Sequence, residues 1–336
     1  MKRITVGING FGRIGRTLYR LLDGEPGIRV AMVNDLADAP TLAHLLKYDS
    51  IHGVFSKTID SGPNYINCGT EKTEVTRFED PGKIPWARAG VDLVVESTGR
   101  FKTKETLEKH LSAGASRVLL SAPPEEESIP MIVYGINHNT LDKGDLIFSC
   151  ASCTTHNAAP MIQVLDELCG IQQAYITTVH SYTSDQSLHD RPHRDLRRAR
   201  AAAQSIVPTT TGAAEALTRI FPHLAEVIGG CGIRVPVPNG SLTDITANVG
   251  KPASIQEINA TFKEFSEQGL SNVLQFTEDP IVSIDINNSS YSCTFDSQMT
   301  SVIGSMVKVI GWYDNETGYS SRIIDTVKWL TEKDYL

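Results

Sequence analysis

The feature that most constrains this chain is a glycine-rich turn close to its N-terminus. A short apolar, β-branched run at 3–8 precedes the turn, and a segment with helical spacing of apolar residues, 13–22, follows it. Between them, the six residues from Gly10 to Gly15 read GFGRIG and fit the pattern G-x-G-x-x-G. In that pattern the first glycine permits the turn, the second lets a pyrophosphate approach the backbone, and the third allows close helix packing. The sequence therefore predicts a strand, a tight turn and a helix that bind a dinucleotide.

An acidic residue stands where such folds hold the cofactor's ribose. Asp35 lies 20 residues after Gly15, at the end of a second predicted strand, 28–33. Its carboxylate would accept hydrogen bonds from the ribose hydroxyls and repel a 2′-phosphate. The alternative is a glycine-rich turn with an unrelated surface Asp, and the register of the two features argues against it. We expect NAD as the cofactor, in preference to NADP.

The two halves of the chain show different patterns. Before residue 150, continuous apolar runs are typical of strands buried on both faces of a parallel sheet; they lie at 92–95, 117–120, 132–135 and 146–149. After it, few helices interrupt longer strand-like segments, which indicates a mainly antiparallel sheet; these segments lie at 171–180, 226–235, 241–249 and 301–312.

This pattern predicts an α/β protein with two domains. We expect a Rossmann-type dinucleotide-binding domain at 1–152 and an α+β catalytic domain with a mainly antiparallel sheet at 153–314. The segment 315–336 is predicted to be a helix that returns to the first domain and completes it.

Composition excludes several classes of protein. The 336 residues carry 31 Lys and Arg against 39 Asp and Glu, and the net charge of −8 argues against nucleic-acid and anionic-membrane partners. No window approaches the roughly 18 apolar residues of a membrane span. The six cysteines do not form two C-x-x-C motifs in tandem, which argues against a disulfide scaffold or a metal site. We expect a cytoplasmic protein that binds no metal.

A cysteine begins the helix predicted at 153–168. Cys153 follows an apolar strand, so the helix dipole and the first N–H groups would stabilise its thiolate. His180, at the end of a strand-like run, is the candidate base, and as an imidazolium it would lower the thiol pKa further. The alternatives are a small buried cysteine and a packed histidine, and spacing alone leaves them open.

The loop 181–205 is polar, rich in arginine and long enough that a compact fold would keep it only for a purpose. Threonines at 209–211 precede Gly212, where a helix is predicted to begin. Guanidinium groups and a hydroxyl-rich helix N-terminus suit phosphate recognition. A solvated basic face is the alternative, but clustering of arginines in an acidic chain favours an anion site; they are Arg191, Arg194, Arg197, Arg198 and Arg200.

Together these motifs resemble the phosphorylating glyceraldehyde-3-phosphate dehydrogenases over nearly the whole chain. The matching stretches are INGFGRIGR at 8–16, HLLKYDSIHG at 44–53, ESTGRF at 96–101, ASCTT at 151–155, TTVHSYT at 177–183, DLRRARAAAQSIVPTTTGAA at 195–214, RVPVPN at 234–239 and WYDNETGYS at 312–320. The resemblance implies a glycolytic or gluconeogenic oxidoreductase that converts D-glyceraldehyde 3-phosphate and inorganic phosphate to 1,3-bisphosphoglycerate with reduction of NAD. It also implies a homotetramer with the loop 181–205 packed between subunits.

The resemblance further implies a role for individual residues. The nucleophile, which forms a hemithioacetal and then a thioester, falls on Cys153, and the base falls on His180. The pocket for the substrate's phosphate falls on Thr183, Asp185 and Arg234, and the pocket for inorganic phosphate on Ser152, Thr154, Arg198, Thr211 and Gly212. Beyond Gly10, Gly12, Gly15 and Asp35, cofactor contacts fall on Arg13, Ile14, Arg77, Thr98, Ser121 and Asn315, with Asn315 fixing the nicotinamide amide.

Several residues depart from the family's usual pattern. Cys150 and His156 stand where Asn is usual, and Thr317 where Trp is usual. We expect His156 to pack; for Cys150 and Cys153, a reversible disulfide and two diverging thiols are both open. Arg191 stands where NAD-preferring members carry Leu, in a loop that in the family reaches a neighbouring subunit's adenine ribose, so NADP is expected as a secondary cofactor.

Two alternatives to this function remain. Erythrose-4-phosphate dehydrogenase shares the scaffold, but the segment 208–214, PTTTGAA, resembles the phosphorylating enzyme better. A binding paralogue with little turnover is the other, and the intact set of catalytic and anion-binding residues argues against it.

Overall fold

The computed structural model describes residues 3–69 and 71–336, which form two compact units. The first unit includes the chain up to Ile132, then 138–151 and 320–336, and the second includes 133–137 and 152–319. The predicted division differs from these units by one residue near 152 and by five near 315, and it placed 133–137 in the first domain.

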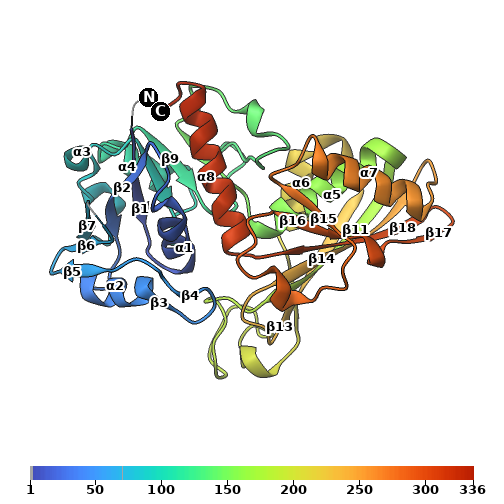
Figure 1. Cartoon of the computed structure of the whole chain (residues 1–336), viewed down its shortest axis with the longest axis horizontal. Helices are drawn as coiled ribbons and strands as arrows, with labels where there is room; N and C mark the ends of the chain where they lie inside the picture. The colour runs from blue at the N-terminus through green and yellow to red at the C-terminus, as the bar shows by residue number, and fades with distance from the viewer. Residues whose placement is uncertain (1–2, 70) are drawn as a thin grey trace. The chain divides into compact units, whose positions relative to one another are not determined.

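The first unit is built on one eight-stranded sheet in the order β10-β9-β8-β1-β2-β7-β6-β5 (Figure 1). The strands from β10 to β7 run parallel, and the short β6 and β5 extend the sheet antiparallel. This confirms the Rossmann-type α/β prediction. The elements are β1 (Ile4–Asn9), α1 (Arg13–Leu22), β2 (Ile28–Asn34), α2 (Ala39–Lys47), β3 (Tyr48–Asp49), β4 (Gly53–Val54), β5 (Asp60–Gly62), β6 (Tyr65–Asn67), β7 (Lys72–Thr76), α3 (Trp86–Ala89), β8 (Leu93–Glu96), α4 (Lys104–Ser112), β9 (Arg117–Leu120) and β10 (Ile147–Ser149).

The central strands of this sheet are buried along their whole length. Every residue of β1, β8 and β9 is buried, which explains why their sequences are continuous apolar runs without alternation. The strand predicted at 132–135 was wrong. Met131 makes a single bridge to Ser149, and the chain then turns, because Gly135 has φ +86° and Asn137 Oδ1 accepts the Val133 N–H at 2.7 Å.

The second unit contains a sheet in the order β12-β13-β11-β14-β18-β16-β15, with β17 paired to β18. Two pairs, β11 with β13 and β15 with β16, are parallel and the other pairs are antiparallel, which confirms the mainly antiparallel prediction. The elements are α5 (Cys153–Cys169), β11 (Ile171–Ser181), β12 (Val207–Thr209), α6 (Ala213–Ile220), β13 (Ile228–Val235), β14 (Ser241–Val249), α7 (Ile255–Glu267), β15 (Leu274–Thr277), β16 (Cys293–Asp296), β17 (Ser301–Ile303) and β18 (Met306–Tyr313).

Helices cover one face of the second sheet. The helix α5 packs on β11, β14, β16 and β18, and α6 and α7 lie beside it on the same face (Figure 1). Along β14 the residues alternate between buried and partly exposed, as expected for a sheet with one helix-covered face. The single strand predicted at 301–312 was wrong, because a two-residue turn at Gly304, with φ +61°, folds it into the hairpin of β17 and β18.

The chain ends in α8 (Thr317–Glu332), the red helix of Figure 1, which belongs to the first unit from Ser320 onward. Within that unit, Trp329 packs edge-to-face on His138, and Thr326 Oγ1 accepts a hydrogen bond from the Cys150 thiol at 3.9 Å. The predicted helix face of Tyr319, Ile323, Val327 and Leu330 is buried. Among the described residues, no helix combines the length and apolarity that crossing a bilayer requires.

Candidate active site

The three glycines of the N-terminal turn have three distinct environments. Gly10 has φ +91°, and a Cβ there would lie 2.7 Å from the backbone nitrogen of Thr98. A Cβ at Gly15 would collide with the carbonyl oxygen of Gly10, whereas a Cβ at Gly12 would meet no atom within 4 Å. Only Gly10 and Gly15 are therefore required by the chain's own packing. The open space at Gly12, directly before the first turn of α1, fits the close approach of a phosphate.

The Asp35 carboxylate is held against this turn. Its Oδ2 accepts the N–H of Phe11 at 2.8 Å, and its Oδ1 accepts the N–H of Ala37 at 3.0 Å. Beside it lies a cavity of about 240 Å³. The cavity is lined by Asn9, Gly10, Gly12, Asn34, Asp35, Leu36, Phe78, Glu79, Ser97, Thr98, Arg100 and Phe101. The predicted acid and two of the predicted glycines therefore share one cavity at the carboxyl ends of β1, β2 and β8.

The other predicted cofactor residues of the first unit also follow strand ends or begin α1. Arg77 follows β7 and donates to the Leu36 carbonyl at 2.7 and 2.9 Å, while Thr98 and Ser121 follow β8 and β9. Arg13 and Ile14 begin α1, where Arg13 forms an ion pair with Asp49. Burial raises the pKa of Asp49, but hydrogen bonds from Arg13 and from two backbone N–H groups outweigh it and lower that pKa to about 2. Parallel sheets bind ligands at this edge.

Asn315, the last predicted cofactor residue, belongs to the second unit. Its Oδ1 accepts hydrogen bonds from the hydroxyls of Ser181 at 2.9 Å and Ser241 at 3.1 Å. With its oxygen so engaged, the amide presents Nδ2 as a donor, which is the group that a carboxamide oxygen requires. Sequence reasoning did not identify the two serines, which lie on β11 and β14.

Cys153 is the first residue of α5, as predicted. Ser152 caps the helix, because its Oγ accepts the N–H of Thr155 at 3.1 Å. The neighbouring His156 packs as expected: its Nδ1 lies 3.1 Å from the Ser152 carbonyl, and its ring stands edge-on to Tyr319. The Cys153 side chain is partly exposed, whereas the next nine residues of α5, 154–162, are buried.

The structure brings Cys153 and His180 together. The Sγ atom lies 3.5 Å from Nε2 of His180, which the strand β11 carries to this point. The other ring nitrogen, Nδ1, lies 2.7 Å from the carbonyl oxygen of Ser181. The Ser181 carbonyl can only accept, so this contact favours a ring proton on Nδ1 and a lone pair on Nε2 facing the sulfur. The Arg234 guanidinium can only donate, and its Nη1 lies 2.7 Å from the same Nδ1, which favours the opposite tautomer.

The electrostatics of this pair differ from the sequence expectation. Burial raises the pKa of the Cys153 thiol, although Arg234 and hydrogen bonds at Thr154 oppose the rise. Burial and the Arg234 cation lower the pKa of His180 to about 3. Both shifts favour a thiol and a neutral imidazole, whereas the N-terminus of α5 and the Arg234 cation favour the expected thiolate.

The residues predicted for the two anion pockets are linked by an ion pair. Arg198 Nη1 lies 3.0 Å from Asp185 Oδ2, and Asp185 also accepts a hydrogen bond from the Thr183 hydroxyl. Arg198 Nε donates to the Thr209 hydroxyl at 2.9 Å. Arg234 approaches His180 instead, with Nη1 2.7 Å from Nδ1. Asp185 thus connects the pocket predicted for the substrate's phosphate to Arg198 of the other.

The remaining anion residues lie at helix N-termini. Thr211 Oγ1 accepts the Ala213 N–H at 3.2 Å, and Gly212 directly precedes α6. The hydroxyls of Thr154 and Tyr313 form a hydrogen bond of 2.9 Å, and the Tyr313 hydroxyl forms a second one of 2.9 Å with the hydroxyl of Thr178. Tyr313 is buried and stands edge-on to the His180 ring. Sequence reasoning missed Tyr313, although it lies in the quoted motif at 312–320.

Cys150, the first cysteine of the C-x-x-C pair, is a buried free thiol. Burial raises the pKa of Cys150 to about 12, despite its hydrogen bond to Thr326. All six cysteines of the chain are free in this structure. The thiol of Cys150 is therefore protonated at neutral pH, and only Cys153 combines exposure with a nearby base.

Comparison with known proteins gives matches over the whole chain. The family model described as glyceraldehyde 3-phosphate dehydrogenase, NAD binding domain, matches residues 4–104, and its C-terminal domain model matches 152–315. The chain is 48% identical over 332 residues to the glyceraldehyde-3-phosphate dehydrogenase of Geobacillus stearothermophilus, covering 98% of this chain and 99% of that one. It is 48% identical to the Thermotoga maritima enzyme of the same name over 97% and 98% of the two chains. It is 49% identical to glyceraldehyde-3-phosphate dehydrogenase 2 of Streptomyces avermitilis over 96% and 97%.

Proposed function

This chain belongs to the glyceraldehyde 3-phosphate dehydrogenase family, and from that membership we propose that it oxidises and phosphorylates D-glyceraldehyde 3-phosphate to 1,3-bisphosphoglycerate. As a member of the family it is an NAD-dependent oxidoreductase. The single observation that carries the chemical mechanism is the 3.5 Å separation of Cys153 Sγ and His180 Nε2 at the start of α5.

The first step is addition of the sulfur to the aldehyde. In the tautomer with the ring proton on Nδ1, towards the Ser181 carbonyl, the neutral imidazole turns its Nε2 lone pair to the thiol and accepts the S–H proton as the carbon–sulfur bond forms. The resulting alkoxide takes the proton back from Nε2, which leaves a hemithioacetal on Cys153. A general base works best with a pKa near the working pH, and an anion bound to Arg234 would raise the low pKa of His180 towards that range.

The second step is oxidation of the hemithioacetal to a thioester. When bound, NAD supplies the acceptor for the hydride that leaves the substrate carbon. The residues present fit such a cofactor: Gly12 leaves room for phosphate, and Asp35 and Thr98 line the adjacent cavity. His180 accepts the hydroxyl proton through Nε2 while Asn315, oriented by two serines, offers its Nδ2.

The third step releases the product. Inorganic phosphate attacks the thioester carbon, the carbon–sulfur bond breaks, and the sulfur leaves as thiolate and recovers the proton held by His180. The cationic Arg198 and the N-terminal turn of α6 are the groups we assign to this phosphate. Arg234, Thr183 and Asp185 are the groups we assign to the phosphate of the substrate, and Asp185, which accepts from Thr183 and pairs with Arg198, joins the two anion sites.

We assign these roles to two domains as predicted from the sequence. Residues 1–152 with 315–336 bind the cofactor, and residues 153–314 carry the nucleophile, the base and the anion sites. The ranges matched by the two family models, 4–104 and 152–315, support this division.

We also propose a cytoplasmic homotetramer. Leu188, Leu196 and Ile206 in and beside the loop 181–205 are 72%, 81% and 70% exposed, an arrangement that a second copy of the chain would cover. Free cysteines are typical of a reducing compartment. Light scattering of the purified chain tests the assembly: four chain masses are expected, and Leu196→Asp should lower that number.

One assay tests the function. Reduction of NAD and of NADP is followed with glyceraldehyde 3-phosphate or erythrose 4-phosphate, with and without inorganic phosphate. Steady turnover that requires both glyceraldehyde 3-phosphate and inorganic phosphate is expected, and without phosphate a single burst should remain as the acyl-enzyme accumulates. Higher kcat/KM for erythrose 4-phosphate, or turnover that ignores phosphate, would identify the alternative dehydrogenase. No turnover with any pair would identify a binding paralogue.

A further inference from the structure

A buried polar network runs beneath the nucleotide cavity of the first unit and contains residues that the proposed mechanism does not use. Trp86 Nε1 donates to Nδ1 of His110 at 3.0 Å, and Nε2 of His110 lies 3.1 Å from Oε2 of Glu96. Glu96 and His110 are both 0% exposed. Burying two ionisable side chains in a core costs stability unless they are paired and hydrogen-bonded, so their presence calls for a functional explanation.

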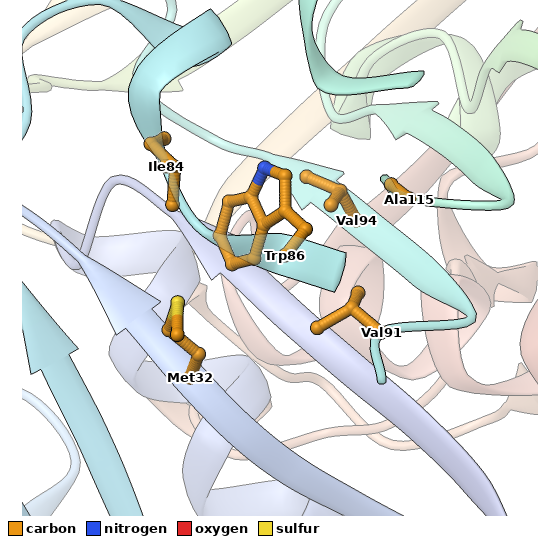
Figure 2. Close-up of a cluster of buried hydrophobic side chains, with 6 residues drawn as sticks. All are labelled: Met32, Ile84, Trp86, Val91, Val94 and Ala115. Atoms are coloured by element: carbon orange, nitrogen blue, oxygen red, sulfur yellow. The ribbon is translucent and has the colours of Figure 1, made fainter. Parts of the chain in front are cut away.

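The indole fixes the tautomer of the histidine. An indole N–H is only a donor, so Nδ1 of His110 must accept and the ring hydrogen sits on Nε2. That hydrogen points at the Glu96 carboxylate. Trp86 itself cannot move easily, since it packs among Met32, Ile84, Val91, Val94 and Ala115 (Figure 2). A Cβ on Gly7 of β1 would lie 2.6 Å from the indole ring, which shows how closely the strand approaches it.

The Glu96 carboxylate also contacts residues that line the cavity. Oε1 of Glu96 accepts the N–H and the hydroxyl of Thr98 at 2.8 and 2.5 Å, and Oε2 accepts the Asn9 amide at 2.6 Å. Asn9 Oδ1 in turn accepts the amide of Asn34 at 2.8 Å. Asn9, Asn34 and Thr98 all line the cavity beside Asp35. One carboxylate therefore ties together the ends of β1, β2 and β8.

We propose that Trp86 and His110 are positioning residues for the cofactor, which act through Glu96 to hold Thr98 and Asn9 at the floor of the nucleotide cavity. The proposal rests on the proposed NAD-dependent function. The physical basis is preorganisation: a carboxylate that accepts from four donors, on Thr98, Asn9 and His110, is held in one orientation, so the loop after β8 is ordered before the cofactor arrives. Without the histidine N–H, Glu96 would be buried with less compensation and would turn towards other donors, taking Thr98 with it.

Binding of NAD to cofactor-free protein, measured by calorimetry, tests the proposal with a matched pair of variants. Trp86→Phe removes the donor and keeps an aromatic ring, whereas Val94→Ala leaves a void beside that ring in the same apolar cluster and removes none of the network's hydrogen bonds. We expect Trp86→Phe to raise the Kd for NAD about five- to tenfold, the loss of one buried hydrogen bond. Val94→Ala should change the Kd less than twofold at a similar loss of thermal stability. Equal effects on Kd, or none from Trp86→Phe, would overturn the proposal.

A second pair acts on the histidine. His110→Gln retains an amide donor and acceptor, and His110→Leu retains only the approximate volume. The glutamine variant should bind NAD at least fivefold more tightly than the leucine variant and should keep kcat at saturating NAD. Indistinguishable Kd values for the two would show that His110 only fills space.

A measurement on the wild-type protein adds a readout that does not depend on NAD binding by the variants. Nitrogen-15 spectra of histidine-labelled protein, with the His110 signal assigned by its loss in His110→Gln, should show a neutral ring protonated at Nε2. A ring protonated at Nδ1, or at both nitrogens, would overturn the proposal. Failure of the wild type to bind NAD would instead overturn the proposed function, so the two failures are distinguishable.

Discussion

The Nη1 atom of Arg234 lies 2.7 Å from Nδ1 of His180, on the ring nitrogen that does not face Cys153. The same guanidinium donates to the Ser181 carbonyl at 3.0 Å. A cation at this distance lowers the pKa of His180 in addition to the larger effect of burial. An anion bound to Arg234 would offset that charge, so binding of the substrate's phosphate would make His180 a stronger base at the moment when a base is needed.

The first prediction separates the two roles of Arg234. Arg234→Leu should lower kcat/KM for glyceraldehyde 3-phosphate by about 10- to 100-fold, the range expected for lost hydrogen bonds to a charged group. Glyceraldehyde, which lacks the phosphate, should lose far less. Steady-state kinetics with both aldehydes check this, with Arg234→Lys as the control that retains the charge. Equal losses for the two substrates would mean that Arg234 acts through His180 rather than through the phosphate.

The second prediction concerns stability in acid. The pKa of His180 is about 3 in the folded chain, against about 6.5 for an unfolded histidine. Between these values the unfolded state binds the extra proton, so stability is complete above pH 6.5 and falls as the pH approaches 3. At pH 4.5 the protonation of His180 in the unfolded state should lower the free energy of unfolding by about 3 kcal/mol relative to pH 8.

The variant His180→Gln lacks the titrating group and isolates its contribution. Urea unfolding of cofactor-free protein at pH 8 and pH 4.5 gives the loss of unfolding free energy for each protein. The loss should be about 3 kcal/mol smaller in His180→Gln than in the wild type, while other groups contribute equally to both. The same loss in both proteins would show that His180 is protonated normally in the folded state.

The third prediction compares two glycines of the N-terminal turn. At Gly12 a methyl group meets no atom within 4 Å, so Gly12→Ala should fold with near wild-type stability but bind NAD at least about tenfold more weakly, because the methyl occupies the approach of the phosphate. At Gly15 the methyl collides with the Gly10 carbonyl, so Gly15→Ala should lose about 1–3 kcal/mol of stability. Thermal unfolding and NAD calorimetry distinguish the two. A Gly12→Ala protein that binds NAD normally would place the pyrophosphate elsewhere.

The sequence predicts the elements whose signals are local. The turn at 10–15, the strand ends beside Asp35 and the helix that begins at Cys153 follow from periodicity and from residues a few positions apart. The prediction of a strand at 132–135 failed because an apolar run does not reveal the turn at Gly135. The prediction of a single strand at 301–312 failed because the turn at Gly304 was taken as part of it.

Contacts between residues far apart in the chain cannot be predicted from local sequence patterns. The Cys153 and His180 pairing could be proposed from the chain, but its protonation depends on burial and on Arg234, which is 54 residues from His180. The link between Glu96 and Asn9 spans 87 residues and joins two polar side chains that composition would place on the surface. Such networks are set by tertiary packing, which no local pattern encodes.

The last prediction concerns the choice between NAD and NADP. Asp35 uses both carboxylate oxygens to accept backbone N–H groups, so its charge is fixed beside the cavity, whereas Arg191 is exposed on the loop 181–205. Asp35→Ala should raise the ratio of kcat/KM for NADP over NAD about tenfold or more by removing repulsion from the 2′-phosphate. Arg191→Leu should lower NADP use and leave NAD use unchanged. Kinetics with both cofactors check each variant, and a ratio that follows Arg191 but ignores Asp35 would mean that the loop, and not the end of β2, decides cofactor specificity.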